Sequence, residues 1–528
     1  MTTFSRILQP ATCSPTSWLN RERTVLVSIV FQLSQIASVI VSIRGSLNYN
    51  YGVNSRSLVP NFALRSALPA GLCALLLIPG LLLGQTPARP PYLDQRFDED
   101  WSFLKDPARR ADPWDSWKYI SFGEASPNSY LSIGGEGRVR WDFFRNASFG
   151  SVPNSPHGFL LQRYLLHADA HAGRHVRIFT QFQSGIETGR VGGPRLTDKN
   201  TLEVHQAFVD LSTSADPNRG VTLRAGRQEF EFGAGHFISA SEVFNVRRSF
   251  DGVKLSIHAG AWTLLAIAAR PDLTRPDAFD DVPDHQQTMW GAGAFGRNPL
   301  IRHANLSIYY IGLDRKLVRV DQGAGRDRRH TVGSRTWGKL RGWDYNYELS
   351  FQLGTFGRGN IHGLGAASDT GYTFAKAKFA PRLGLRANMT SGDKDPREPD
   401  TQSFSPLFPG TAYSGKIGLI GPSNIIDTTP TLRLRLHPRV YFLPEDSFFW
   451  RESTADGIYG VTGALTRSGR PSKARYIGNQ LSLPVQLQVN RHLTYTVFYS
   501  RFFAGRYLKE SPPGRSVTYV STFITYKF

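Results

Sequence analysis

Apolar and polar side chains alternate along most of the chain beyond residue 130, with a period of two residues. In residues 343–353 every odd position holds Trp, Tyr, Leu or Phe, and every even position holds Asp, Asn, Glu, Ser or Gln. Residues 131–143, 382–390, 432–437 and 481–490 follow the same rule. Successive side chains of a β-strand point to opposite faces, so these segments predict many two-faced strands separated by turns rich in Gly, Pro, Asn and Asp.

Almost no helical periodicity follows residue 110, so no helices are expected to cover the apolar strand faces. A soluble sheet with one apolar face needs a second sheet or helices against that face. Lipid covers such faces directly when the sheet closes into a barrel and turns its polar face toward a wet lumen. We therefore predict an all-β fold, a transmembrane antiparallel β-barrel of the bacterial outer membrane. A soluble sandwich or β-helix is the alternative.

The last strand supports the barrel. Residues 519–527 alternate between an apolar and a polar face and end at Phe528. This resembles the closing strand of outer-membrane barrels, whose terminal Phe is read by the assembly machinery. Phe528 and Tyr526 are therefore our candidate assembly signal, with an edge strand of a soluble sandwich as the alternative.

The N-terminal region contains a segment typical of a secretory signal peptide. Residues 67–83 form a short apolar run that follows Arg65 and precedes small residues. Some 60 residues come before it, and they include a second apolar run, residues 25–43, which leaves a helical anchor open. We expect true initiation near residue 58 or 59. The predicted parts are a mis-annotated or dispensable extension (1–58), a signal peptide (59–84), a periplasmic lead-in (85–125) and the barrel (126–528).

Cysteine usage and charge narrow the function. Cys13 and Cys73 are the only cysteines, so residues 85–528 offer no thiol for a disulfide, for catalysis or for a metal. The whole chain carries a net charge of +20; residues 1–84 hold six Arg and one Glu, which leaves +15 for the rest. A strongly basic protein prefers anionic partners. Nucleic acid would explain the charge but neither the alternation nor the terminal Phe, so we expect no nucleic-acid partner.

Chain length sets the size of the barrel. Residues 126–528 provide 403 positions, which fit 16 to 20 strands at roughly 10 residues for each tilted strand plus its turn. A barrel of that size encloses a channel instead of a filled interior.

Several motifs, in the same order, resemble the alginate export porin family over roughly residues 95–528. The resemblance implies an outer-membrane barrel of about 18 strands with a cationic lumen, through which a linear polyuronate leaves the cell. It is more specific for the fold than for the substrate. The motifs are Asp98–Leu104, Tyr130–Arg140, Gln206–Leu211, Gly226–Gln228, Asn245–Gly252, Ser391–Pro396 and Phe404–Pro409.

Arginines on the polar strand faces are the candidate pore residues. A polyuronate carries one carboxylate per sugar, and Arg binds carboxylates with two parallel hydrogen bonds and a charge that does not titrate. Neighbouring acids are expected to hold the arginines and to temper their field. Each Arg alone has an alternative role as the ion-pair partner of such an acid. The candidates are Arg138, Arg140, Arg163, Arg177, Arg224, Arg382, Arg386, Arg433 and Arg435, with Arg247 and Arg248 at an expected constriction and Glu136, Asp142, Asp210 and Glu348 as acids.

No resident cofactor is expected. The loop at 391–400 carries Asp393 and Asp395, weak candidates for calcium because oxygen ligands suit that ion; an ordinary solvated loop is the preferred interpretation. His167, Asp169 and His171 alternate along one strand and are interpreted as lumen lining. The string at 291–296 matches a dinucleotide fingerprint but does not open a helix, so we reject it.

Two functions remain, and the first is preferred: export of an anionic exopolysaccharide, or uptake of small acidic solutes by a general anion-selective porin. A barrel enzyme would need an acid/base or Ser/His cluster, and none is found, so no enzyme is predicted. Expected partners are outer-membrane lipid and lipopolysaccharide, the barrel assembly machinery, the polysaccharide and a periplasmic scaffold protein, around a monomeric barrel.

Overall fold

The structure, a computed structural model, describes residues 89–528 except 124, 125, 127, 215, 217, 218, 233, 234 and 411–414. The extension, the signal peptide and both cysteines lie outside the described residues. Within the described part of the chain, no helix is long and apolar enough to cross a membrane.

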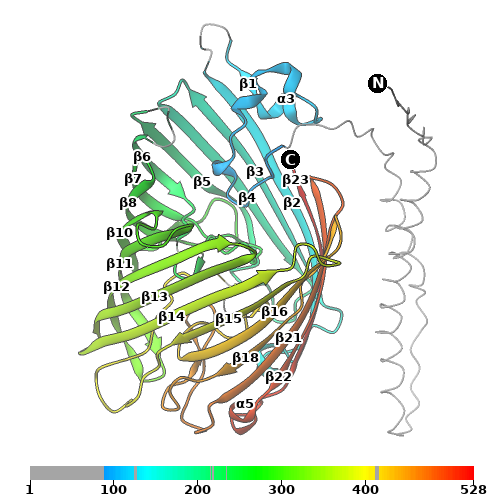
Figure 1. The fold of residues 1–528 in the computed structure, drawn as a ribbon. Helices are drawn as coiled ribbons and strands as arrows, with labels where there is room; N and C mark the ends of the chain where they lie inside the picture. The colour runs from blue at the N-terminus through cyan, green and yellow to red at the C-terminus, as the bar shows by residue number, and fades with distance from the viewer. Residues whose placement is uncertain are drawn as a thin grey trace, which may run out of the picture. The chain divides into compact units, whose positions relative to one another are not determined.

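One antiparallel sheet dominates the structure and closes on itself (Figure 1). Each long strand pairs with its predecessor along the chain, and the last strand, β23, pairs with both β22 and β2. In chain order the first half contains β2 (Tyr130–Arg145), β3 (Phe159–Ala172), β4 (Val176–Thr188), β5 (Asn200–Ser212), β6 (Arg219–Gln228), β7 (Phe250–Ala259), β8 (Trp262–Leu273), β10 (Gln287–Arg297) and β11 (Ala304–Val320).

The second half continues in the same way and contains one interrupted strand. β17 and β18 both pair with the strands on either side, β16 and β21, and Pro444 lies between them. Proline has no N–H for the ladder, which accounts for the break. The barrel therefore has 18 strands, as predicted. The second half comprises β12 (Gly323–Leu340), β13 (Trp343–Phe356), β14 (Gly359–Thr373), β15 (Arg382–Thr390), β16 (Ile425–His437), β17 (Val440–Phe442), β18 (Glu445–Trp450), β21 (Tyr476–Gln488), β22 (Leu493–Ala504) and β23 (Val517–Lys527).

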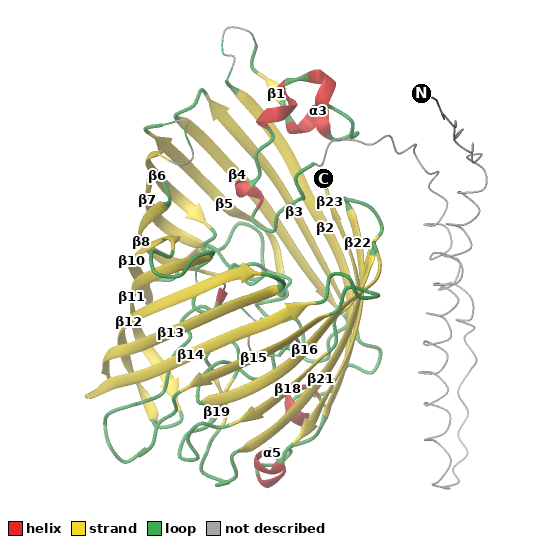
Figure 2. Ribbon diagram, in the orientation of Figure 1, coloured by secondary structure: helices red, strands yellow, loops and turns green. Residues whose placement is uncertain are grey.

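In the part of the chain that the structure describes, helices and short strands lie at the barrel ends and in the loops (Figure 2). They are η1 (Arg96–Asp98), η2 (Ser102–Lys105), η3 (Pro107–Arg109), α3 (Asp115–Lys118), β1 (Ile120–Ser121), α4 (Ala147–Gly150), β9 (Val282–Pro283), β19 (Ile458–Tyr459), β20 (Leu465–Arg467) and α5 (Arg506–Glu510). The first five of these elements precede the barrel and belong to residues 89–121.

The two faces of the sheet differ as the alternation predicts. On β13, Tyr347, Leu349, Phe351 and Leu353 are 46–57% exposed on the outer face. The polar residues between them, at positions 348, 350 and 352, are buried on the inner face. An apolar outer band suits lipid, and a polar inner wall suits a water-filled lumen.

The two ends of the barrel also differ. At the end where the chain terminates, strands are joined by short turns such as 173–175, 260–261 and 341–342; we call this the short-turn end. At the opposite, long-loop end, connections such as 229–249 and 391–424 are long. The first apolar core lies inside the barrel, where these two loops meet the inner faces of β7 to β11. Its members include Phe237, Ile238, Phe404, Phe408, Tyr309 and Leu313.

Candidate functional site in the barrel lumen

Parts of two long loops, residues 235–249 of the loop 229–249 and residues 401–410 of the loop 391–424, fold into the lumen and bind each other. The backbone N–H of Phe408 donates to the carbonyl of Phe237 at 2.7 Å, and the N–H of Ser239 donates to the carbonyl of Phe408 at 3.0 Å. Figure 1 shows loop segments inside the ring of strands. The lumen is therefore partly filled by the chain itself.

The loop 229–249 crosses the lumen from wall to wall. Its His236 hydrogen-bonds the inward-facing Glu348 of β13, and its Glu242 forms an ion pair with the inward-facing Arg163 of β3. β3 and β13 are nine steps apart around the 18 strands, so they lie on opposite walls. The segment between these two anchors narrows the passage.

A network of buried charges attaches this loop to β2 and β3. Arg163, with no exposed surface, donates from Nε to Glu136 Oε1 at 3.1 Å and also binds Glu242. Arg247 binds Glu229 through two hydrogen bonds of 2.6 and 2.8 Å and contacts Glu242 as well. Because a buried charge is stable only with a partner, these pairs fix the loop in place.

Two further arginines, Arg138 of β2 and Arg248 of the loop itself, lack a close carboxylate partner of this kind. Arg138 donates to the backbone carbonyls of Glu242 at 3.0 Å and Phe244 at 2.6 Å, and the carboxylate of Glu242 is 3.7 Å away. For Arg248 no carboxylate among the described residues lies within ion-pair distance; its Nη1 is 3.5 Å from the Ser239 carbonyl and its guanidinium is 5.4 Å from the Phe408 ring. Arg248 thus keeps its positive charge without a carboxylate partner among the described residues, within the crossing loop.

Most of the other candidate arginines pair with inner-wall acids. The pairs, with their shortest distances, are Arg140–Asp142 (3.1 Å), Arg177–Asp169 (2.7 Å), Arg224–Asp210 (2.6 Å), Arg382–Asp344 (2.5 Å) and Arg386–Glu445 (3.0 Å). Glu348 accepts a hydrogen bond from the Tyr309 hydroxyl at 2.6 Å in addition to its contact with His236. These five arginines therefore form the ion pairs with neighbouring acids that were the alternative to substrate binding. Their contact with a substrate stays a prediction.

Arg433 and Arg435 of β16 differ from that set. Both side chains are exposed toward the short-turn end, on the same face as the buried Asp427 and Thr429. No ion pair involves either guanidinium within the part of the chain that the structure describes. They remain available to an anionic solute.

The segment before the barrel enters the lumen at the short-turn end, which sequence reasoning missed. The ring of Phe97 packs edge-on against Phe179 of β4 and Phe208 of β5, at 6.0 and 5.7 Å, and the guanidinium of Arg224 lies 4.5 Å from it. The carbonyl of Phe97 accepts a hydrogen bond from Arg177 at 2.6 Å. Only the aromatic and acidic composition of this segment hinted at a docking role.

The same segment covers the end of the chain. The Trp114 ring lies 4.3 Å from that of Phe528, and its Nε1 donates to the Tyr526 hydroxyl at 2.8 Å. Arg96 donates to the Phe528 carbonyl oxygen at 2.8 Å. The candidate assembly signal is thus under the lead-in in the folded protein, and its reading by a partner stays a prediction.

The acids proposed for calcium do not form a common cluster. Asp395 is paired with Arg397 at 2.8 Å in an exposed loop. Asp393 is fully buried beside Asp456, and burial raises its pKa to about 6. The calcium prediction gains no support from this geometry. His167 and His171 also separate: the first stacks on Phe179 and the second lies 3.3 Å from Asp169.

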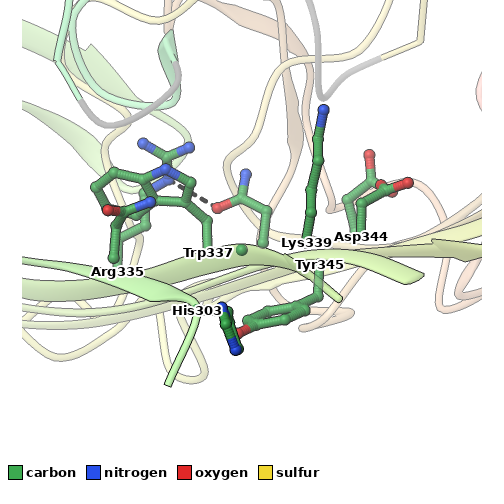
Figure 3. A pocket seen from close by; sticks show the side chains of 10 residues that line it. His303, Arg335, Trp337, Lys339, Asp344 and Tyr345 are labelled. Atoms are coloured by element: carbon green, nitrogen blue, oxygen red, sulfur yellow. Dashed lines mark hydrogen bonds between the residues drawn. The ribbon is translucent and has the colours of Figure 1, made fainter. Parts of the chain in front are cut away.

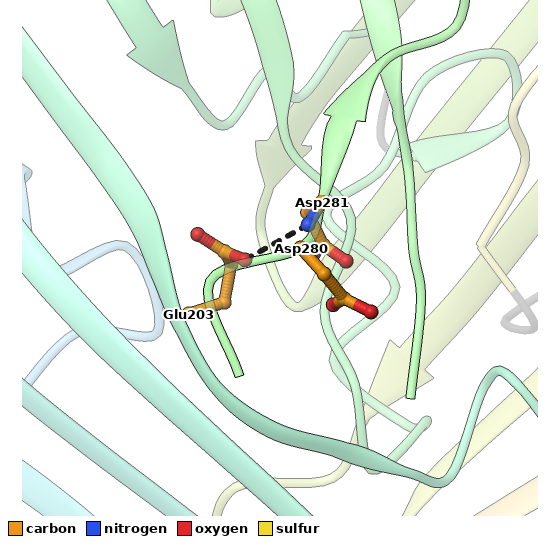
Figure 4. Close-up of side chains that lie close together, drawn as sticks. All are labelled: Glu203, Asp280 and Asp281. Atoms are coloured by element: carbon orange, nitrogen blue, oxygen red, sulfur yellow. Dashed lines mark hydrogen bonds between the residues drawn. The ribbon is translucent and has the colours of Figure 1, made fainter. Parts of the chain in front are cut away.

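A different group of three carboxylates, Glu203, Asp280 and Asp281, has ligand atoms within 4.8 Å of one another (Figure 4). The N–H of Asp281 donates to Glu203 Oε2 at 3.0 Å, and Asn200 donates to the Asp281 carboxylate at 2.7 Å. Burial, with the nearby charge of Glu203, raises the pKa of Asp281 to about 6. The residues are 77 positions apart in sequence, so no local spacing revealed the cluster.

Solved structures of porins have a similar fold. The chain is similar to Pseudomonas aeruginosa OccD3 (OpdP), with 11% identity, a TM-score of 0.52 and coverage of 81% of this chain and 97% of that one. It is also similar to a BenF-like porin from Pseudomonas fluorescens Pf-5, with 9% identity, a TM-score of 0.51 and coverage of 75% and 98%. At such identities the likeness concerns the fold alone. The search of curated proteins found no match.

A closed barrel with an apolar outside, a polar inside and loops across its lumen defines an outer-membrane channel of the porin class. The family is more specific. The alginate export family matches residues 129–522, three quarters of the chain, and the protein belongs to it.

Proposed function

We propose that the protein conducts an anionic exopolysaccharide, an alginate-like polyuronate, out of the cell. The observation that carries this proposal is the gathering of Arg138, Arg163 and Arg247 around Glu242 of the loop 229–249, with Arg248 elsewhere on the same loop beside Ser239 and Phe408. A polymer with one carboxylate per sugar is attracted to a constriction lined by guanidinium groups. The passage then favours anions over neutral and cationic solutes.

The paired acids keep each contact weak enough for the polymer to move. Glu136, Glu229 and Glu242 bind Arg163 and Arg247 and so neutralise much of their charge. Conduction requires binding that admits the solute but also releases it. Arg248 and the partly compensated Arg138 supply the remaining attraction.

In this proposal the short-turn end faces the periplasm and the long-loop end faces the cell exterior, as outer-membrane barrels are built. A periplasmic scaffold would then meet the lead-in, residues 89–121, and the short turns. The assembly machinery, lipopolysaccharide and outer-membrane lipid complete the proposed partners, with a monomeric barrel and no enzymatic activity.

A general anion-selective porin for small acidic solutes is the second candidate. One observation favours it: the loops 229–249 and 391–424 meet in an apolar core inside the lumen, with Phe237 and Phe408 at its centre. A passage narrowed by packed rings suits small molecules better than a polymer. Both candidates predict anion preference, and they differ in how uronate oligomers act.

Single-channel recording of the refolded protein in planar bilayers tests the proposal. We expect preference for anions and concentration-dependent block by oligouronates but not by neutral oligosaccharides of equal length. Arg248→Gln should lower the anion-to-cation permeability ratio roughly twofold or more, because it removes the uncompensated charge at the constriction. Arg326→Gln is the matched control, since Arg326 is exposed and paired with Asp314 at 2.6 Å.

The outcomes separate the candidates. Anion conduction without oligouronate block would favour the small-solute porin. Preference for cations in the unmodified protein would contradict both candidates.

A further inference from the structure

A second group of inward-facing side chains, separate from the arginines of the constriction, lies at the short-turn end on β11 to β14. It contributes Arg335, Trp337 and Lys339 of β12 and Asn346 of β13 to a cavity of about 560 Å³. This volume is within the usual range for small-molecule sites. Tyr345 lines the cavity from the other face of β13, and the two carboxylates in its lining, Asp344 and Asp369, are both paired with Arg382. Positions 335, 337 and 339 share the inner face because strand side chains alternate. Two cations with an aromatic ring between them thus line one wall.

Arg335 is held in a fixed orientation. Its Nε donates to Asn346 Oδ1 at 2.7 Å, and its guanidinium carbon lies 4.2 Å from the centre of the Trp337 ring (Figure 3). No hydrogen bond of its two Nη groups to any described residue is found. A guanidinium that is fixed by one nitrogen and a ring presents its remaining N–H groups as a ready fork for a carboxylate.

Lys339 provides a second positive charge. Its register partner across the ladder is Asp344, but that carboxylate is bound by Arg382, with Nε to Oδ2 at 2.9 Å. No ion pair of Lys339 occurs in the described part of the chain, and Figure 3 shows its side chain extended away from the strand, beside Asp344. The ammonium group is therefore free to meet an anion.

The cavity adjoins the crossing loop. Arg335 lies opposite Glu348 in the β12–β13 register, and Glu348 is the residue that binds His236 of the loop 229–249. A solute that moved along the inner wall from the short-turn end would meet the cavity before the constriction. The cavity thus lies on the path that the proposed function requires.

We propose that this cavity, defined by Arg335, Trp337 and Lys339, is a binding site for the uronate units of an acidic saccharide. Arg335 and Lys339 bind carboxylates, and the flat ring of Trp337 gives an apolar surface for a sugar ring and fixes the Arg335 fork. The inference rests on the proposed function for its choice of saccharide. It adds a place of capture at the short-turn end, ahead of the arginines at the loop.

Isothermal titration calorimetry of the full protein in detergent with a linear trimer of galacturonate tests this inference. We expect the unmodified protein to bind trigalacturonate and not the neutral trimer maltotriose. In the double variant Arg335→Gln/Lys339→Met the affinity for trigalacturonate should fall roughly tenfold or more, since two carboxylate partners are lost. Lys378→Met is the matched control, because it removes one lysine from a turn at the same end, where Lys378 lies 5.0 Å from the Phe379 ring. Trp337→Leu should also weaken binding, and Trp337→Phe should weaken it less.

Folding is checked in each variant by the shift in gel mobility on heating that folded barrels give. Equal affinity for trigalacturonate in the folded double variant and the unmodified protein, or equal affinity for maltotriose, would overturn the inference. These results are independent of the proposed function: bilayer block by oligouronates that persists in the double variant leaves the export channel standing without this site. Trigalacturonate binding that the double variant loses, in a protein that prefers cations, leaves the site without the export channel.

Discussion

Lys118 of α3 is buried in a position where a lysine is costly. Its side chain has no exposed surface, and its Nζ has no hydrogen-bond partner among the described residues. The rings of Trp101, Tyr92 and Phe528 lie 5.3, 5.5 and 5.9 Å from the ammonium nitrogen. Burial lowers the pKa of Lys118 from 10.5 to about 7. Docking of the lead-in on the barrel is therefore coupled to proton release from Lys118.

The sign of this dependence follows from linkage. Between pH 7 and 10.5 an undocked lead-in holds a proton on Lys118 that the docked form has released, so docking strengthens as the pH rises through this window. Between pH 7 and pH 9 the gain is of the order of 2 kcal/mol. Hydrogen exchange of residues 89–121, corrected for intrinsic rates, should show greater protection at pH 9 than at pH 7.

Lys118→Met is the control for this prediction. The variant retains a buried side chain of similar length and has no titrating amine, so its protection should vary little between the two pH values. An unmodified protein whose lead-in is equally protected at both, or less protected at pH 9, would contradict the role assigned to Lys118.

At the scale of elements, the loop 229–249 determines how wide the lumen is. It is anchored at His236 on β13 and at Glu242 on β3, and it is covered by the loop 391–424. Replacing residues 236–244 by a short Gly-Ser linker removes both anchors. Single-channel conductance should then rise roughly twofold or more, because the lumen of an 18-stranded barrel without this obstruction is an open, water-filled channel.

The control replaces residues 375–378, in the turn between β14 and β15 at the other end, by Gly-Ser-Gly-Ser. That change leaves the lumen intact and should leave conductance close to that of the unmodified protein. Unchanged conductance after removal of segment 236–244 would show that this loop does not limit the passage.

The strands were predictable from the sequence, whereas the fold of the loops inside the barrel lumen was not. Alternation is a local signal, and each strand pairs with its sequence neighbour, so period and turn positions suffice for the fold. The hydrogen bond between His236 and Glu348 joins residues 112 positions apart, and the sequence of neither segment predicts it. The alternation of even and odd strand positions likewise placed the Arg138 and Arg163 side chains on the inner face. It could not predict their hydrogen-bond and ion-pair partners, because these depend on how the loop 229–249 folds back into the lumen.

At the scale of the whole molecule, the two ends of the barrel chain meet. The backbone of Phe528 exchanges hydrogen bonds of 3.0 Å with Gly135 of β2, which completes the closure between β23 and β2. Its ring lies under Trp114 of the lead-in. Phe528 thus has a structural place in the folded protein beside its predicted role as an assembly signal, and the two roles can be separated.

Phe528→Ala and Trp114→Ala separate them. If Phe528 is read during assembly, Phe528→Ala should lower the amount of folded barrel in the outer membrane several-fold. Trp114→Ala, which removes the ring that covers Phe528 and the hydrogen bond to the Tyr526 hydroxyl, should not. Heat-modifiable gel mobility of outer-membrane fractions gives the folded amount, and refolding of both purified variants into detergent micelles gives their intrinsic ability to fold. Because micelles contain no assembly machinery, Phe528→Ala should refold there nearly as well as Trp114→Ala. A shared defect in micelles would instead assign the effect of Phe528 to its contacts with Trp114 and β2 and would contradict the assembly signal.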